Sequence, residues 1–512
     1  MSNTLEFLSC HGIKSPDYLA TKLRKRFSHI ETESMQGRWC YLDTFDWRLY
    51  NQNWVLETFI ERSGVQLIWR ELNTRRIRAV LWRDKLPVFA QDLPKGSHWL
   101  QLGQILEMRA LMPLACYDLE DKQMILRNGE SKAVVHLDVR QREDDSEIRL
   151  TEVRGFGKEF QRTLDWLEKK FHCKKIKTDP VLERLQREQR KPGSYQRKPP
   201  SQNNPNLRSD QVCKTILRHL LDVMEENEPG MRKQIDSEFL HDFRVAVRRS
   251  RSLLTQVKAV FPHSREQRFR RELTWLQEVT GPARDMDVYL LDFPHLQAEL
   301  PPEQRENLLS LGTFLIAVQQ DAHKNLSRAL DSQRYRNFIR DWRTFLEAPE
   351  PRYTSLANAA QPIGKVAAAG IWKLFRRAIR QGEAITDASP ADDMHELRKT
   401  CKKLRYLLEF FEGLFPPKEM SAMVKALKVL QDNLGTYQDL QVQQESLVGF
   451  KDSMAEQGLS THDTREAIQA LIELFGKREK RVRSEFPAHF QVFSSRDNKK
   501  HFKNRFHKRS KP

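Results

Sequence analysis

One stretch of the sequence decides the fold: His241-Asp242-Phe243-Arg244-Val245-Ala246-Val247-Arg248-Arg249-Ser250-Arg251. On a helix, at about 100° per residue, one arc collects the histidine and three arginines, His241, Arg244, Arg248 and Arg251. Apolar residues such as Phe243 and Val247 fall on the opposite arc. The pattern predicts an amphipathic helix with an apolar side for the core and an almost purely cationic exposed side.

The same pattern returns 154 positions later, beginning at His395. The matched pairs are His241 with His395, Arg244 with Arg398, Arg248 with Lys402, Arg249 with Lys403, and Arg251 with Arg405. The match continues without a gap to give an internal repeat of 241–288 and 395–442. This period is far too long for a solenoid unit. The sequence therefore predicts two copies of a multi-helix half-domain, each presenting one basic helix.

Length and charge set the class of protein. The 512 residues allow two to four domains, and a hydrophobic content of 39% is enough for a real core. The formal net charge of +18, with 69 acidic residues present, indicates a basic protein with a mixed surface. Such an excess favours polyanionic partners, such as nucleic acid, polyphosphate or an anionic membrane surface.

Cysteine spacing and hydropathy indicate the compartment. The six cysteines lie far apart with no ligand-like spacing, so we expect reduced, partly buried thiols and neither disulfides nor a zinc site. No leader-like N-terminal stretch and no apolar run of about 18 residues is present, so we expect no membrane contact. The expected location is the cytoplasm, with polyphosphate granules as one candidate site within it.

Composition divides the chain into four parts. Residues 1–182 combine helices with many short alternating strands, which predicts an α+β domain built on an antiparallel barrel or strongly curved sheet. Residues 183–208 form a polar, proline-containing linker. Residues 209–490 are helical throughout, and 491–512 form a basic tail that we expect to be disordered until it binds a partner.

The N-terminal part resembles the CYTH family of triphosphate tunnel domains. The resemblance rests on Tyr41-Leu42-Asp43-Thr44-Phe45-Asp46-Trp47-Arg48-Leu49 and on later strand-like runs at 105–109, 133–138 and 148–153. CYTH enzymes place an ExExK signature on the first strand, whereas the run at 4–9 has one acid, Glu6, and no lysine. The strand at 55–59 lacks the family's arginines and carries Glu57. These departures from the CYTH pattern predict a non-catalytic domain. We therefore assign neither a catalytic residue nor a metal ligand to it.

The duplicated part resembles the CHAD family, the conserved histidine α-helical domain. The resemblance rests on the two basic helices and on Ala283-Arg284-Asp285-Met286-Asp287-Val288. It implies two four-helix bundles related by a pseudo-twofold axis, with the basic helices lining a shared groove. It also implies inorganic polyphosphate as the partner, with no cofactor.

The candidate polyphosphate-binding residues follow from the repeat and from a second basic row at helical spacing. They are His241, Arg244, Arg248, Arg249, Arg251, His395, Arg398, Lys399, Lys402, Lys403 and Arg405, together with Lys373, Arg376, Arg377 and Arg380. A basic helix face is usually only solvated, but a solvated face normally mixes both signs of charge. Repulsion left uncompensated in two places favours an anionic ligand.

Several alternatives stay open. His241 and His395 are equally compatible with a phosphate contact and with a cap or core histidine. Asp285 and Asp287 could hold a metal, although an ion pair between Arg284 and Asp285 is favoured. A nucleic-acid binder would use the same electrostatics, but the basic faces lack interleaved aromatic residues. Hydrolysis of triphosphate or polyphosphate by the N-terminal domain is the remaining alternative.

Overall fold

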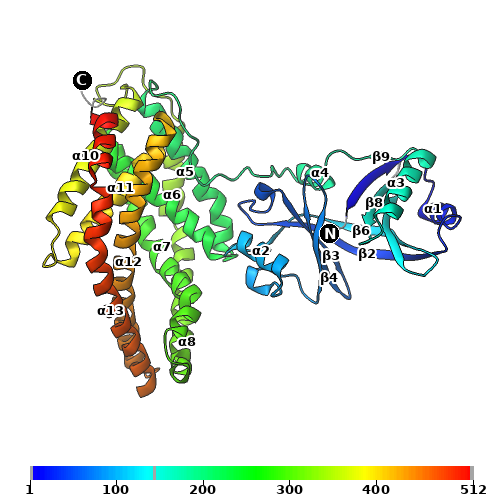
Figure 1. Cartoon of the computed structure of the whole chain (residues 1–512). Helices are drawn as coiled ribbons and strands as arrows, with labels where there is room; N and C mark the ends of the chain where they lie inside the picture. Colours follow the sequence, from blue (N-terminus) through cyan, green and yellow to red (C-terminus); the bar gives the residue numbers. More distant parts are fainter. Residues whose placement is uncertain (1–3, 142–145, 508–512) are drawn as a thin grey trace. The chain divides into compact units, whose positions relative to one another are not determined.

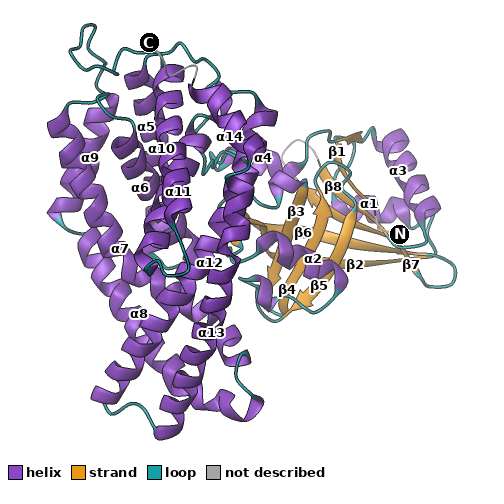
Figure 2. Cartoon of the chain, turned by 60° about the vertical axis from the view of Figure 1, so that its left-hand side comes forward, coloured by secondary structure: helices purple, strands orange, loops and turns teal. Residues whose placement is uncertain are grey.

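The chain folds into two compact units, residues 1–196 and 197–512 (Figure 1). The computed structural model describes residues 4–141 and 146–507. The boundary between the units falls inside 183–208, the segment that the sequence predicts to be a linker. Strands belong to the N-terminal unit, and the C-terminal unit consists of helices and loops (Figure 2). The expected fold class, an antiparallel α+β unit followed by an all-α unit, is confirmed.

The N-terminal unit is built on a nine-stranded antiparallel sheet in the order β5-β4-β3-β2-β6-β7-β8-β1-β9. Its strands are β1 (Leu5–Cys10), β2 (His29–Asp43), β3 (Trp54–Glu61), β4 (Gly64–Glu71), β5 (Ile77–Arg83), β6 (Met112–Arg127), β7 (Ala133–Gln141), β8 (Ser146–Glu152) and β9 (Lys174–Lys175). One hydrogen bond shows that the sheet is strongly curved. Arg75, in the turn between β4 and β5, donates to the carbonyl oxygen of Lys177, which follows β9, at 3.1 Å. The two edges of the sheet are therefore close to each other.

Four helices accompany the sheet: α1 (Pro16–Leu23), α2 (Ser97–Leu106), α3 (Gly157–Phe171) and α4 (Pro180–Arg187). Helix α3 buries Phe160, Leu164 and Leu167 in one core, together with residues of β1, β7 and β8. Helix α2 buries Leu102 and Leu106 in a second core against β3 and β4. The face of α3 is the one that the sequence periodicity predicts. The strand-like run expected at 105–109 is wrong, because residues 105 and 106 form the last turn of α2 and pack in its core.

The expectation of six reduced cysteines is wrong for four of them. Cys10 is bonded to Cys173 and Cys40 to Cys116, and in each disulfide the Cα atoms are 4.2 Å apart. Cys40 and Cys116 are direct partners in the register of β2 and β6, although 76 positions separate them in the chain. Pairing of the strands therefore creates a proximity that cysteine spacing does not reveal. The other two, Cys213 and Cys401, are buried free thiols as expected.

The C-terminal unit is helical from residue 209 onward. Its helices are α5 (Ser209–Arg232), α6 (Ser237–Gln256), α7 (His263–Ala298), α8 (Leu309–Leu330), α9 (Gln333–Glu347), α10 (Ile363–Ala384), α11 (Ala391–Phe410), α12 (Pro417–Glu456), α13 (His462–Phe493) and α14 (Arg496–Phe502). Helices α5 to α8 pack in succession, and α10 to α13 do the same (Figure 1). No helix in the described ranges is both long and apolar enough to cross a membrane.

The repeat in the sequence is also a repeat in space. Helix α11 begins and ends 154 positions after α6, and α5 and α10 begin at the same offset. Two reciprocal backbone hydrogen bonds join the copies, from Ser209 N to Gln361 O at 3.0 Å and from Ile363 N to Leu207 O at 2.9 Å. Each partner in one bond is the equivalent of a partner in the other. Farther along, Tyr289 Oη donates to the carbonyl oxygen of its own equivalent, Gln443, at 3.2 Å.

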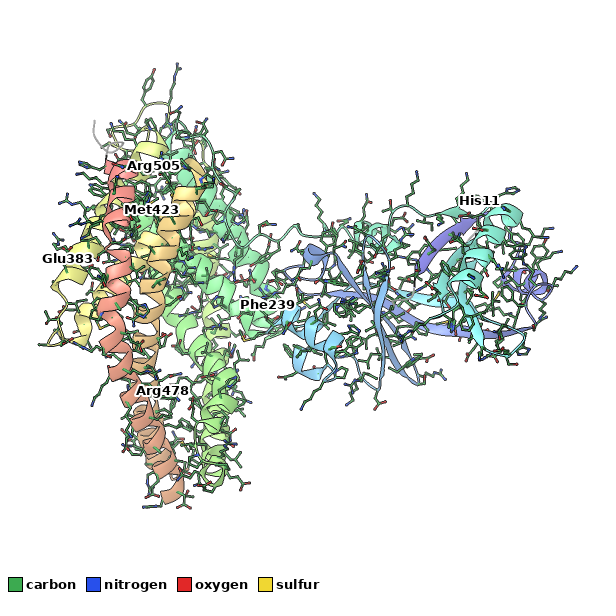
Figure 3. All side chains as sticks on the ribbon, in the orientation of Figure 1. His11, Phe239, Glu383, Met423, Arg478 and Arg505 are labelled. Carbon is green, nitrogen blue, oxygen red and sulfur yellow. A yellow bond between two sulfur atoms is a disulfide. The ribbon has the colours of Figure 1, made fainter. Side chains whose placement is uncertain are left out.

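The C-terminal tail corrects another expectation, because 496–507 is folded. Helix α14 and the turn after it bury Phe502 and Phe506 completely. Phe502 stacks on Phe375 of α10 with ring centroids 3.9 Å apart. Arg505, labelled in Figure 3, pairs with Glu419 of α12. The burial of two aromatic rings stabilises the folded tail despite its high positive charge. The expectation of disorder at 508–512 concerns residues outside the described ranges.

Candidate functional site

Helix α6 presents its cationic strip from a nearly buried position. Its first turn is capped by Asp236, whose carboxylate accepts from the backbone N–H groups of Glu238 and Phe239. Neighbouring helices α5, α7 and α11 pack against it, so all its residues are buried or half-buried. The half-buried arc includes the predicted residues His241, Arg244, Arg248 and Arg251. These cations are therefore recessed among helices and do not project freely into solvent.

The equivalent strip of α11 meets the strip of α6. Arg398, Lys402 and Lys403 are half-buried on this helix, which packs directly against α6. Burial, together with the nearby positive charges of Arg398 and Arg248, lowers the pKa of Lys402 to about 8. The pKa of Arg398 is lowered by burial and, after partial compensation by Asp439, by Arg248. Cations from both copies of the repeat thus converge, and we name them the α6/α11 cluster: Arg244, Arg248, Arg251, Arg398, Lys402 and Lys403.

The two equivalent arginines of the cluster are held in different ways. Arg244 Nη1 donates to the carbonyl oxygen of Gln277 at 2.9 Å and to Thr280 Oγ1 at 2.8 Å, both on α7. Its pKa falls to about 10, mainly through burial. Arg398 finds Leu434 at the position equivalent to Thr280, and its Nη2 lies 3.2 Å from Asp439 instead. Arg398 is therefore held by a single exposed carboxylate, which an anionic ligand can replace.

Several polar atoms beside the cluster lack a protein partner. In the described part of the chain, Arg248 Nε and Arg398 Nε are buried and make no hydrogen bond. The amide of Gln431, the α12 equivalent of Gln277, is likewise buried and unsatisfied at both its oxygen and its nitrogen. A buried donor without an acceptor costs about 1–3 kcal/mol. The unsatisfied N–H groups among these atoms gain most from a ligand with many acceptor oxygens.

Three of the predicted residues lie outside the cluster because acidic side chains hold them. Arg249 is buried, and its Nη2 lies 2.7 Å from Glu409 of α11, so it fastens the two helices together. Arg405 is exposed and lies 2.7 Å from the other oxygen of the same carboxylate. Lys399 is exposed and pairs with Glu396 at 2.6 Å. Of the second predicted row, Lys373, Arg376, Arg377 and Arg380 are all exposed on α10.

The two histidines are positioned by the next helix of their own half. Burial and the adjacent charge of Arg284 lower the pKa of His241 to about 4, so its ring is neutral at pH 7. The ring of His395 forms a hydrogen bond through Nδ1 with Gln438, the equivalent of Arg284. In the free protein His241 therefore adds no positive charge, and it can contact a phosphate only as a neutral donor.

Some neighbours of the cluster could not be found from the repeat. Arg270 on α7 lies close enough to Arg251 to lower its pKa, after the larger effect of burial. Its equivalent is Val424, so the duplication gives no signal for it. The ion pair expected between Arg284 and Asp285 is replaced by another one. Arg284 lies 3.5 Å from Glu238 at the start of α6.

A metal at Asp287 is not supported by its surroundings. The carboxylate is buried, and Oδ1 accepts from Gln319 Nε2 at 2.7 Å and lies 2.9 Å from His323 Nε2. These α8 groups use the oxygen that a cation would need. The side chain acts as a link between α7 and α8.

The interior of the N-terminal unit neutralises its own charges. Arg70 is fully buried, and its guanidinium donates to Glu57 Oε1 at 2.8 Å and to Asp179 at 2.6 and 2.9 Å. The second oxygen of Glu57 lies 3.0 Å from Arg149. Glu57 therefore does occupy a position where the CYTH family has an arginine. Its charge is balanced by two arginines from other strands, Arg70 of β4 and Arg149 of β8.

Aromatic side chains fill much of the remaining interior. Phe7, Trp39, Tyr41 and Tyr117 line a cavity of about 30 Å³. Arg149 lies over the ring of Trp39 at 4.4 Å, and Arg184 over Tyr117 at 3.8 Å. A cavity of this size holds about one water molecule.

Comparison with known proteins identifies the helical unit. Residues 215–448 match the family model of the CHAD domain. A CHAD domain from the plant Ricinus communis is 23% identical, with a TM-score of 0.49, over 59% of this chain and 97% of its own. PptA from Streptomyces chartreusis is 15% identical, with a TM-score of 0.45, over 56% and 99%. HpAC1 from Hippeastrum, which has a dominant triphosphatase activity, is 13% identical, with a TM-score of 0.24, over 38% and 100%.

A search of curated protein sequences found no significant match. The match to the family model lies within 209–490, the region that the sequence assigns to this family, and it covers both basic helices. Residues 215–448 of the helical unit are therefore similar to the CHAD domain family.

Proposed function

We propose that the helical unit binds inorganic polyphosphate at the α6/α11 cluster. One observation carries the proposal: cations from both copies of the repeat are packed together at half-buried positions, where burial and the charge of Arg248 both lower the pKa of Arg398 and of Lys402. Such packing destabilises the free protein, because each charge is partly desolvated beside others of the same sign. A linear polyanion removes this repulsion and supplies acceptors to donors such as Arg248 Nε.

The recessed position favours polyphosphate over nucleic acid. A duplex offers its phosphates on a broad surface that projecting side chains reach best, and single strands need aromatic rings for stacking. Tyr406 of α11 is the aromatic residue beside Arg251 and Arg398, and it is half-buried. A slender chain of phosphates can enter where a base cannot.

Competition between polyphosphate and DNA tests this proposal on the full chain. We expect long-chain polyphosphate to displace a labelled DNA duplex at physiological salt with at least about tenfold preference. Neutralisation of the six cluster cations should give a log–log salt slope of about −4 to −5. Equal affinity for the two polymers, or a flat salt dependence, would contradict the proposal.

Binding should also depend on pH through Lys402. Its pKa is about 8 in the free protein, because burial and the charges of Arg398, Arg248 and Arg405 outweigh the opposing effect of Asp439. A bound anion stabilises the protonated amine, so binding takes up a proton above pH 8. Affinity should therefore rise roughly tenfold as the pH falls from 9.5 to 7.

The matched variant for this prediction is Lys402→Arg, which keeps its charge over the whole pH range. Its affinity should be nearly constant between pH 7 and 9.5 in fluorescence titrations. An unchanged pH profile in the variant would assign the proton uptake to another group.

The N-terminal unit is proposed to have no catalytic role. Its buried acids are occupied by Arg70 and Arg149, and aromatic rings fill the space beside them. Metal-assisted hydrolysis needs carboxylates that are free to hold the metal. This arrangement supports a companion domain for the polyphosphate-binding unit.

A further inference from the structure

The outer helices of the two halves carry opposite charges at equivalent positions. Helix α10 presents Lys373, Arg376, Arg377 and Arg380, all exposed. The equivalents on α5, 154 positions earlier, are His219, Asp222, Val223 and Glu226. The duplication preserves the helices in this region but reverses the charge, so the helix that packs on α6 is acidic where the helix that packs on α11 is basic.

The charges on the two helices also differ in how they are compensated. Asp222 of α5 lies 3.2 Å from Arg343 of α9, which also pairs with Glu225. On α10, the four basic side chains have no acidic partner among the residues that the structure describes. The acid at the end of the helix, Glu383 (Figure 3), pairs with Lys499 of the tail. The row on α10 is thus a free cationic surface of the kind that an anionic ligand stabilises.

Packing fixes the direction in which this row faces. Trp372 and Phe375 of α10 contact His507 and Phe502 of the folded tail. Another side of the helix packs on α11, where Leu407 lies beside Gly370. The row occupies the arc between these two contacts at i, i+3, i+4 and i+7, a spacing that places its side chains along one line. The line runs for about 10 Å along the helix.

The row is continuous with the α6/α11 cluster through one residue. Lys403 is half-buried on α11, and its pKa is lowered by burial, then by Arg377 of α10 and, more weakly, by Arg251 of α6. Lys403 therefore lies near cations of both helices. On the α5 side the equivalent position is Arg249, which is buried against Glu409 and cannot act as a bridge.

We propose that α10 binds the part of a long polyanion that extends beyond the α6/α11 cluster, so that the bound chain leaves the cluster over the second half of the repeat only. This inference rests on the proposed function and adds direction and length selection to it. A chain that reaches both surfaces gains the second contact at high effective concentration. A chain too short to reach Arg377 gains nothing from α10.

The test is a triple variant, Lys373→Gln, Arg376→Gln and Arg380→Gln, in the full chain. Its affinity for polyphosphate of about 100 units should fall roughly 10- to 30-fold, because three phosphate contacts and their counterion release are lost. Its affinity for tripolyphosphate should stay within about twofold of the wild type. Circular dichroism should be unchanged, since the three side chains are exposed.

A matched pair of substitutions on α5 provides the control. Asp222→Asn with Glu226→Gln removes two charges at positions equivalent to Arg376 and Arg380. If the ligand never passes over α5, this variant should bind long chains within about twofold of the wild type, because screening is strong beyond about 8 Å. Much tighter binding would show that the ligand crosses α5 and would overturn the one-sided path.

The remaining outcomes separate this inference from the proposed function. Full retention of long-chain affinity in the triple variant refutes the role of α10, provided that variants of the α6/α11 cluster still lose binding. Absence of polyphosphate binding by the wild-type chain at any length refutes the proposed function itself. An equal loss for tripolyphosphate and long chains would also refute length selection, because α10 would then act as part of a single site.

Discussion

Neutralising Arg248 and Arg398 together is expected to weaken binding of long-chain polyphosphate by at least about 100-fold. Each guanidinium offers charge-assisted hydrogen bonds worth about 1.5–3 kcal/mol, and the loss of two corresponds to two or more powers of ten. The substitutions Arg248→Gln and Arg398→Gln also remove buried donors that lack partners. The free protein should therefore remain folded, and isothermal titration at fixed salt measures the loss.

The control for this prediction uses two other cations of α11. Lys399→Gln with Arg405→Gln removes the same formal charge, but these side chains are exposed and already paired with Glu396 and Glu409. Its affinity should change less than about threefold. If the two double variants lose affinity equally, net charge rather than the α6/α11 cluster determines binding.

Replacing Arg70 by alanine should strongly destabilise the N-terminal unit. The substitution leaves Glu57 and Asp179 buried with one partner fewer, and breaking a buried ion network in this way costs about 3–5 kcal/mol. In calorimetry, the transition of this unit should move down by roughly 10 °C. The transition of the helical unit and its affinity for polyphosphate should stay unchanged.

An exposed pair in the same sheet gives the comparison. Arg127 of β6 lies 2.9 Å from Glu31 of β2, where solvent screens both charges. Arg127→Ala should leave the transition temperature nearly where it is. A similar small effect for Arg70→Ala would mean that its network contributes no more than a surface pair.

The sequence predicts the cationic strips well because a single helix determines them. Periodicity alone places Arg244, Arg248 and Arg251 on one arc, and the repeat adds Arg398 and Lys402. A single helix does not determine which charged neighbours a second helix brings to a residue. Arg249 borders the strip on a helical wheel, but the packing of α11 buries it against Glu409.

The predictions that the structure contradicts have the same physical origin. The lysines and arginines around Phe502 and Phe506 predict a disordered tail, because the rings that bury these residues, Phe375 of α10 and Phe415 before α12, are distant in the sequence. Cys40 and Cys116 become neighbours only when β2 pairs with β6. The sequence likewise shows that β3 has no arginine. It does not show that arginines of β4 and β8 lie beside Glu57, because the folded sheet brings these strands together.

The reciprocal hydrogen bonds between the two halves have a consequence for how far the halves can differ in sequence. Ser209 to Gln361 and Ile363 to Leu207 are the contacts of an isologous dimer, in which each subunit gives and receives the same bond. Here both subunits belong to one polypeptide, so their association does not depend on protein concentration. Joining the halves in one chain also removes a constraint that identical subunits must obey. In a homodimer, Asp222 and Arg376 could not stand at the same position, and neither half could acquire a charge of its own.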